Sequence, residues 1–142
     1  MDAQAVAEKV RDTMLADDAA ARLLGMQVAE VAPGRAVVTM TVRADMLNGF
    51  AICHGGLIAT LADSAFAFAC NARNALTVAS GFGIDILKSA HLDDVLTATA
   101  QETSLAGRTG LYDITVKNQN GDLIAMFRGR SYRLGERKVF EA

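Results

Sequence analysis

One segment, residues 54–72, constrains the fold of this chain more than any other. Alanine, leucine and phenylalanine recur through it without a proline, and Asn71 to Asn74 contains the asparagines and the basic residue that are common at helix ends. The segment predicts one long and mostly apolar helix. Because a helix that is apolar on most sides has to be buried, we expect the rest of the chain to cover it.

The sequence on either side of this helix predicts shorter elements. Before it we expect an amphipathic helix, a short helix that ends at Gly25, and two strands joined by Pro33-Gly34, over the ranges 2–18, 19–24, 26–32 and 35–43. After it we expect four strands over 76–88, 94–103, 109–117 and 122–133, with Asn120-Gly121 in a hairpin turn. This order predicts an α+β fold in which an antiparallel sheet wraps around the long helix. We expect one domain over 1–142, with N-terminal helices within 1–25 and a flexible tail over 134–142.

The composition excludes several classes of protein. The chain has 142 residues with 14 basic and 16 acidic side chains and no run of Lys and Arg, so nucleic acid is not an expected partner. No apolar stretch reaches the ~18–20 residues of a membrane span. Cys53 and Cys70 form no CxxC motif or disulfide framework, and Met1 to Gln4 lacks the start of a signal peptide. We therefore expect a cytoplasmic protein that does not associate with membranes.

The apolar content predicts self-association. Hydrophobic residues make up 51% of the chain, and counting glycine in place of tyrosine takes the apolar share above the ~45–50% that is typical of globular domains. Part of this excess is alanine. The remainder is more apolar surface than one small domain covers, so we expect a homo-oligomer.

The start of the long helix contains a candidate site, His54-Gly55-Gly56. The first backbone N–H groups of a helix have no partner within the helix, and glycines let a ligand atom approach them closely. Such amides stabilise a carbonyl oxygen that becomes an oxyanion. Taken alone, the three residues are better explained as a glycine-rich connection between a strand and a helix.

Asp63 is the second candidate. At 100° per residue it shares a stripe of the helix with small residues, among them Gly56, Ala67 and Cys70. A carboxylate on such an apolar helix is costly to bury without a partner. The purely structural alternative is an Asp that bonds to a neighbouring subunit, and the chemistry gives a functional role only a slight advantage.

The remaining candidates each have a structural alternative. Asn48, six residues before the histidine, is suited to a turn, and its amide is also suited to orienting a water or a thioester oxygen. Phe66 is expected in the core and near the Asp63 side, where it is placed to touch an aromatic group. Lys88 and Arg108 are candidates for binding phosphate, although a solvated strand edge explains each as well.

Two further kinds of site are rejected on spacing. Cys53 and His54 are adjacent, and adjacent side chains rarely form a nucleophile and base pair. The only histidines, His54 and His91, have no partner at a spacing typical of metal ligands, so no metal is expected.

In this order the residues resemble the hotdog-fold acyl-CoA thioesterases, and most closely their phenylacetate-degradation branch. The core of the resemblance is Asn48, His54-Gly55-Gly56, and Asp63 within Leu61 to Ala65. It extends over Met14 to Arg133 through four more motifs: Gly81 to Lys88, His91 to Asp94, Gly107-Arg108-Thr109 and Phe127 to Arg130. The chain departs from the family at Ser89-Ala90, where relatives commonly have Pro-Ala, a difference that concerns a coenzyme contact rather than the chemistry.

The resemblance implies an assembly and a reaction. Two protomers join edge to edge into one continuous sheet, and the dimers pair into tetramers. Each active site lies between two subunits, with the Asp of one facing the glycine pair of the other. The reaction hydrolyses a coenzyme A thioester to a free acid and coenzyme A, without a metal or other cofactor. In the phenylacetate branch the acyl group is phenylacetyl or a ring-hydroxylated phenylacetyl.

By position, the resemblance assigns a role to each candidate. Asp63 acts as general base on water or attacks the thioester directly, and the sequence does not separate these two mechanisms. The Gly55 amide stabilises the oxyanion, Asn48 positions water or the thioester, and His54 shapes the loop or contacts the substrate carbonyl. Gly56, Phe66, Lys88 and Arg108 are the expected substrate-binding residues.

Two other functions fit the same fold. A non-catalytic acyl-CoA sensor would bind the ligand without releasing a thiol, and the lack of any added DNA-binding region counts against it. A hydratase or dehydratase acting on an enoyl or hydroxyacyl chain ranks lower, because those relatives use a differently spaced His and acid pair.

Overall fold

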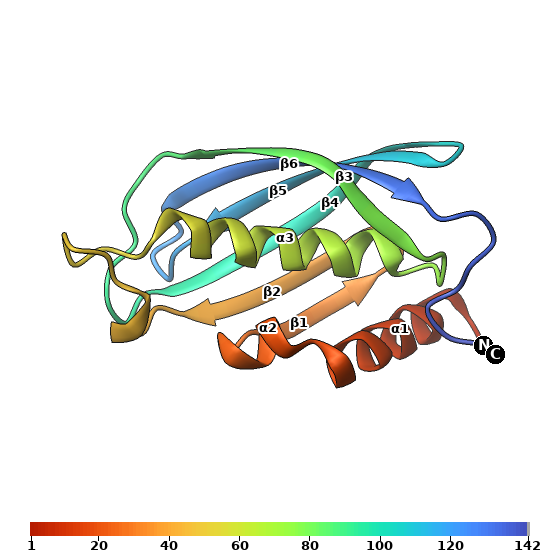
Figure 1. The fold of residues 1–142 in the computed structure, drawn as a ribbon, viewed down its shortest axis with the longest axis horizontal. Coiled ribbons are helices and arrows are strands. Elements are labelled where there is room, and N and C mark those ends of the chain that lie inside the picture. Colours follow the sequence, from red (N-terminus) through yellow and green to blue (C-terminus); the bar gives the residue numbers. More distant parts are fainter. Residues whose placement is uncertain (142) are drawn as a thin grey trace.

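The computed structural model describes residues 1–141 of the chain. Residues 1–141 contain three α-helices, one short 3-10 helix and six strands, and Figure 1 shows how the α-helices and strands are arranged. In chain order they are α1 (Ala3–Asp17), α2 (Ala19–Leu23), β1 (Gln27–Ala32), β2 (Arg35–Thr41), η1 (Ala44–Met46), α3 (Gly55–Asn71), β3 (Thr77–Ile86), β4 (Val95–Ala106), β5 (Thr109–Lys117) and β6 (Leu123–Arg133).

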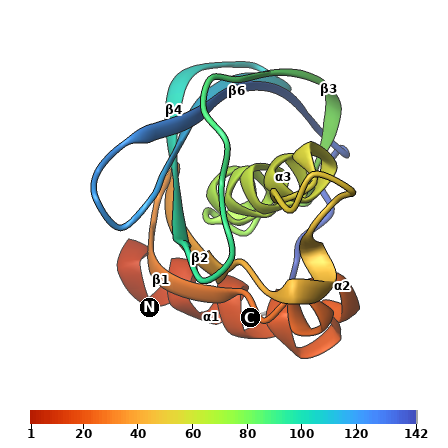
Figure 2. The ribbon, with the colours of Figure 1, turned by 90° about the vertical axis from the view of Figure 1, so that its left-hand side faces the viewer.

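The six strands form one antiparallel sheet around a single helix. Their order is β1-β2-β4-β5-β6-β3, so the strand that follows α3 lies at the edge opposite β1. Figure 2, viewed from one end, shows the sheet curling around α3, with α1 and α2 outside β1 and β2. The predicted α+β fold with a central helix is confirmed.

The long helix is buried on all but one stripe. Ile58, Leu61 and Phe68 are 0–1% exposed and belong to the main core cluster. The uncovered stripe consists of small residues and one acid, all half-buried or exposed: Gly56, Ala59, Thr60, Asp63, Ala67 and Cys70. The helical periodicity therefore predicted both the packed face and the open stripe. Within residues 1–141, no helix has the length and apolarity that crossing a membrane requires.

The two edge strands of the sheet differ in whether another element covers them. At β1, α1 lies alongside the strand, and the Gln4 side chain donates a hydrogen bond to the Val31 carbonyl at 2.8 Å. At the other edge, β3 pairs with β6 on one side only, and Val78, Phe82 and Ile86 of this strand are 43–48% exposed. An uncovered apolar edge of ten residues is a site for pairing with another strand.

The end of the chain packs against the far end of α3. The Asn74 side-chain oxygen accepts hydrogen bonds from the Val139 and Phe140 amides, both at 3.0 Å, and the Lys9 ammonium lies 4.6 Å from the Phe140 ring centre. We expected a flexible tail over 134–142, and residue 142 lies outside the described residues. Up to Phe140, the structure gives this segment specific contacts that a free tail lacks.

The strand ends differ from the expected ones by a few residues. β4 runs to Ala106 rather than to Thr103, because the turn into β5 needs only Gly107 and Arg108. Gly107 adopts a φ of 62°, which a glycine tolerates without strain. A bulge between Glu102 and Ser104 adjusts the register of the longer hairpin.

Candidate active site

Asp63 lies halfway along α3 on the open stripe. Its side chain is half-buried, and it forms no hydrogen bond or ion pair within residues 1–141. Burial raises the pKa of this carboxyl above its ordinary value of 3.8. A carboxylate that is partly removed from water and has no partner is suited to accept a proton or to attack an electrophile.

A cavity of about 330 Å³ opens beside this carboxylate. Its walls come from α3, from the start of β3, from α1 and from the C-terminal segment. Phe66 contributes to it, as expected from its position on the Asp63 side, but 99% of its surface is buried, and its ring packs against Gly129 and Tyr112. The cavity therefore has an apolar, rigid wall next to a single carboxylate.

The head of α3 presents free backbone donors. His54 is the residue before the helix, and its carbonyl accepts from the Leu57 and Ile58 amides at 3.0 and 3.4 Å. The amides of Gly55 and Gly56 have no acceptor within residues 1–141. The helix dipole adds to their attraction for negative charge. These are the properties of an oxyanion site.

Gly55 lies beneath a side chain of the edge strand. A Cβ built there would lie 2.6 Å from Cδ1 of Ile86, which extends from β3 over the helix head. Real Cβ contacts are never this short, so a side chain at this position requires the Ile86 side chain, which is 46% exposed, to turn aside. Gly56 faces open space.

The Asn48 side chain organises the loop before the helix. Its carbonyl oxygen accepts from the Phe50 and Ile52 amides at 2.9 and 3.3 Å, and Ala51 adopts a φ of 60° within the turn. Turn chemistry therefore accounts for the oxygen of this amide. The NH₂ group has no acceptor within residues 1–141, which leaves it free for another partner.

The two chemical groups do not meet within one protomer. Asp63 lies eight residues after Gly55, and at 1.5 Å per residue the two are about 12 Å apart along the helix axis. A thioester carbonyl spans far less than this distance. One protomer therefore holds an acid and a set of amides that cannot act on the same carbonyl.

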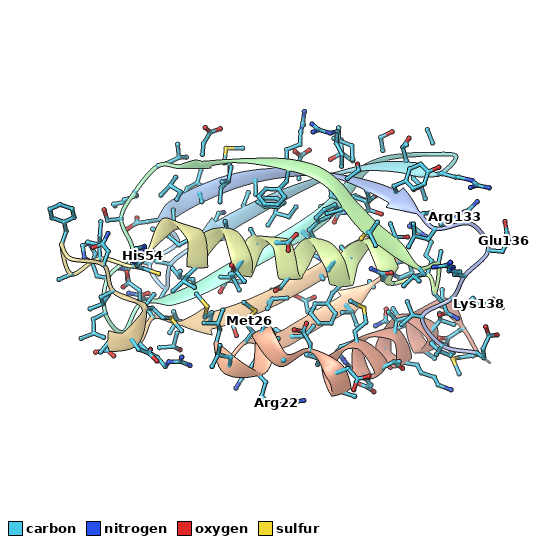
Figure 3. All side chains as sticks on the ribbon, viewed as in Figure 1. Arg22, Met26, His54, Arg133, Glu136 and Lys138 are labelled. Atoms are coloured by element: carbon cyan, nitrogen blue, oxygen red, sulfur yellow. The ribbon has the colours of Figure 1, made fainter. Side chains whose placement is uncertain are left out.

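The two candidate phosphate ligands also lie apart. Lys88 follows β3 at the α3 head and forms an exposed ion pair with Asp122 at 3.0 Å. Arg108 lies in the β4–β5 turn, where its carbonyl accepts from the Arg133 amide at 2.8 Å. Figure 3 shows Arg133 at the end of the molecule opposite His54. The structure does not bring Lys88 and Arg108 together within one protomer.

Other reactive groups have structural roles. Burial raises the pKa of both cysteines, that of Cys70 to about 12, so neither thiol ionises readily. Asp94 accepts from the His91 amide at 2.8 Å and closes a turn, which lowers its carboxyl pKa. In the part of the chain that the structure describes, no three His, Cys, Asp or Glu residues are grouped to hold a metal ion.

The sequence analysis missed most of the cavity wall, including two residues far from α3 in the sequence. Met14 of α1 and Val139 of the C-terminal segment both line the cavity beside Asp63. Met14 falls in the amphipathic helix expected over 2–18, and Val139 in the expected tail. No local pattern marks either residue, because their position depends on how the chain ends pack against α3.

Comparison with known proteins identifies the family. The model of the thioesterase superfamily matches residues 50–125. The acyl-coenzyme A thioesterase PaaI of Escherichia coli is 48% identical over 122 residues, which cover 86% of this chain and 87% of that protein. The solved structure of the E. coli PaaI protein from the phenylacetic acid degradation operon aligns with a TM-score of 0.94 and 44% identity, covering 96% and 99% of the two chains.

A second relative was solved with a ligand. A Streptococcus mutans protein bound to acetyl-CoA aligns with a TM-score of 0.76 and 27% identity, covering 80% of this chain and 91% of that one. The sequence matches include the helix head and Asp63, and the structural matches cover the sheet that wraps α3. The chain therefore belongs to the thioesterase superfamily, has its hotdog fold, and is a thioester hydrolase.

Proposed function

We propose that this enzyme hydrolyses an acyl-CoA thioester, with phenylacetyl-CoA, a ring-hydroxylated phenylacetyl-CoA or a similar aryl or acyl ester as substrate. The observation that carries the proposal is the unpaired, half-buried carboxylate of Asp63 beside an apolar cavity. The names of the relatives support it, since one is an acyl-CoA thioesterase and another was solved with acetyl-CoA. Coenzyme A is part of the substrate, and the chemistry proposed below uses no other cofactor.

Asp63 supplies the nucleophile in either of two ways. As general base, it takes a proton from water, which attacks the thioester carbonyl to form a tetrahedral intermediate. Collapse breaks the C–S bond, and the coenzyme A thiolate accepts a proton. As nucleophile, Asp63 attacks the carbonyl and expels the thiolate, and water then hydrolyses the mixed anhydride. Both routes give the free acid and regenerate the carboxylate.

The oxyanion site comes from a second copy of the chain. Because Gly55 and Asp63 are about 12 Å apart on one helix, the Gly55 amide stabilises the oxyanion at the Asp63 of its partner. Antiparallel pairing of two β3 strands supports this arrangement, since it sets the helix head of one protomer beside the later half of α3 in the other. It also covers the exposed apolar residues of β3. Two such dimers form the proposed tetramer.

The remaining candidates bind and orient the substrate. Asn48 directs its free NH₂ group to water or to the thioester oxygen, and His54 shapes the entrance or contacts the carbonyl. Gly56 allows close approach to the helix head. In an antiparallel pair, Lys88 of one protomer and Arg108 of its partner lie toward the same site, where they bind the phosphates of coenzyme A.

The test is complementation between two inactive variants. Asp63→Asn removes the base, and we expect kcat/KM for phenylacetyl-CoA to fall about 100- to 10,000-fold. Gly55→Pro removes the amide N–H of the oxyanion site at the first helical position, where proline is tolerated. In a dimer of one copy of each, one of the two sites combines an intact Asp63 with an intact Gly55. Random mixing should therefore restore about one quarter of wild-type activity.

Three results contradict parts of the proposal. Full activity in Asp63→Asn removes the proposed catalyst. Failure of the mixed variants to regain activity after exchange of subunits, verified with tagged copies, places both groups within one chain. Tight binding of phenylacetyl-CoA by calorimetry without release of thiol by the wild type makes the protein a sensor rather than an enzyme of this substrate.

A further inference from the structure

The loop that leads into α3 contains the pair Asn48-Gly49. Asn-Gly is a sequence that is prone to deamidation, because glycine has no side chain to keep its backbone nitrogen away from the preceding asparagine side chain. A second such pair, Asn120-Gly121, lies in the turn between β5 and β6. The chain therefore holds the same reactive sequence in two different surroundings, which can be compared directly.

The backbone nitrogen of Gly49 is free to react. Within this loop, the Asn48 amide donates to the Ile52 carbonyl at 2.8 Å, and the Ala51 amide donates to the Asn48 carbonyl at 3.0 Å. The Phe50 and Ile52 amides donate to the Asn48 side chain. The Gly49 amide has no acceptor within residues 1–141, and Gly49 is exposed. Water or hydroxide can therefore reach this N–H and take its proton.

The same turn activates the side-chain carbonyl carbon of Asn48. The oxygen on this carbon accepts from the Phe50 amide at 2.9 Å and from the Ile52 amide at 3.3 Å. Attack on the carbon moves negative charge onto the oxygen, and two fixed N–H donors stabilise such a charge. The NH₂ group of Asn48 has no acceptor within the described residues, so no hydrogen bond opposes its departure.

The pair in the β5–β6 turn lacks these features. The Gly121 amide donates to the Asn118 carbonyl at 3.0 Å, so its N–H is already bonded. The Asn120 backbone amide donates to the Asn118 side chain at 3.0 Å, but the Asn120 side-chain oxygen accepts no hydrogen bond within residues 1–141. Both residues of this pair are exposed, so poor access to water would not explain a slower reaction there.

We propose that Asn48-Gly49 is a self-modification site, at which Asn48 deamidates in the folded protein faster than Asn120 does. The Gly49 nitrogen gives its proton to water or hydroxide and bonds to the side-chain carbonyl carbon of Asn48. The bond from that carbon to the NH₂ group breaks, and the group leaves with a proton as ammonia. Water then opens the cyclic imide to aspartate or isoaspartate. The net reaction consumes water, releases ammonia and needs no oxidant or reductant.

The modification changes a group that the proposed function uses. The aspartate product keeps the side-chain oxygen acceptor but loses the free NH₂ group of Asn48. The isoaspartate product adds a methylene to the backbone just before the helix head, and so alters the path of the chain into α3. Loss of activity as the protein ages rests on the proposed function, whereas the modification itself does not.

The first test compares the two pairs in the wild-type protein. Purified protein is incubated in mildly alkaline buffer, and peptide mass spectrometry follows the loss of each side-chain amide. In the folded protein, Asn48 should react at least about tenfold faster than Asn120. In the urea-unfolded chain, where the loop contacts are absent, the two rates should agree within about threefold. Equal rates in the folded protein, or a faster reaction at Asn120, would overturn the proposal.

A substitution beside Asn48 tests the role of the glycine nitrogen. A Cβ at Gly49 faces open space, so Gly49→Ala should fold normally, and its methyl group should slow the loss of the Asn48 amide at least about tenfold. The rate at Asn120 should not change. The matched control is Gly83→Ala on β3, where a Cβ also has open space and both rates should stay at wild type. An unchanged Asn48 rate in Gly49→Ala contradicts the mechanism.

An activity measurement on the same samples separates the modification from the proposed function. Hydrolysis of phenylacetyl-CoA should decline in step with the loss of the Asn48 amide in the wild type and persist in aged Gly49→Ala. Full activity after the amide is lost would overturn the functional consequence. If the fresh wild type hydrolyses no ester, the proposed function fails, and the mass measurements still decide whether Asn48 is modified.

Discussion

The two ends of α3 are built for different tasks. At the head, the Ile86 side chain of β3 lies over Gly55, and the Gly55 and Gly56 amides have no acceptor within residues 1–141. Toward the other end, the same helix turns a stripe of small residues and one carboxylate to a cavity of about 330 Å³. The start of α3 offers backbone hydrogen-bond donors, and its later half borders a cavity with one reactive carboxylate.

This difference explains why one protomer is incomplete. The first half of α3 has the free Gly55 amide and the second half has the Asp63 carboxylate. The rise of the helix keeps these two groups about 12 Å apart. A single chain cannot fold to bring them together without breaking α3. Two chains in opposite orientation can, and the uncovered edge of β3 lies where such a pair would join.

The largest expected effect comes from removing a donor at the helix head. Gly55→Pro removes the amide N–H at the first helical position, where a helix tolerates proline. Loss of one oxyanion donor should lower kcat about 100- to 1,000-fold with a smaller change in KM. Steady-state kinetics with phenylacetyl-CoA measures the two parameters.

A second substitution makes this prediction specific. Gly55→Ala keeps the N–H, and its Cβ meets only the end of the exposed Ile86 side chain, so it should retain most of the wild-type kcat. The matched control is Gly49→Ala, in the preceding loop, where a Cβ has open space and activity should remain near wild type. A Gly55→Pro enzyme with wild-type kcat would contradict the assignment of the oxyanion site.

A smaller effect separates the two uses of Asn48. Asn48→Asp keeps the oxygen that holds the Phe50 and Ile52 amides and removes the free NH₂ group. If that group positions water or substrate, kcat/KM should fall about tenfold at unchanged Tm. Asn48→Ala, which removes both, should lower Tm as well. Wild-type kinetics in Asn48→Asp would restrict this residue to its turn.

The smallest expected effect concerns how Asp63 makes the free energy of unfolding depend on pH. Burial raises the pKa of Asp63 above 3.8, so the folded protein holds this proton more tightly than the unfolded chain does. The free energy of unfolding therefore falls as the pH rises from below 3.8 through the folded-state pKa. Asp63→Asn lacks this loss and should have the higher Tm at pH 7, with the difference disappearing at low pH.

Thermal unfolding at matched protein concentration, from pH 3 to pH 8, measures this effect. Asp85→Asn, the same substitution at an exposed position of β3, is the matched control. A lower Tm for Asp63→Asn at pH 7 would mean that the carboxylate has a stabilising partner, and it would contradict the idea of a group held ready for reaction.

Local patterns predicted most of the fold and of the helix chemistry. The 100° periodicity of α3 separated its buried face from the stripe with Asp63, and the glycines marked a helix head with free amides. Turn residues fixed the hairpins, as at Gly107. These features depend on residues close together in the sequence, so a single chain reveals them.

Local patterns did not predict the cavity wall, nor the expected pairing of Asp63 with the glycines of a second chain. Met14 and Val139 are 125 positions apart and meet only because both chain ends pack beside α3. The side chain that holds the tail, Asn74, looked like an ordinary helix-end residue. Resemblance to a family supplied the arrangement of Asp63 against a neighbour's glycines, which no periodicity implies.

The hydrogen bond from Gln4 to the Val31 carbonyl has a consequence for assembly. A sheet with two uncovered edge strands can add further copies at both edges, which is how fibrous aggregates grow. Here the chain's own first helix lies along β1, so strand addition at β3, as in the proposed dimer, would stop at a pair. A helix that contributes Met14 to the cavity would thus also limit open-ended polymerisation.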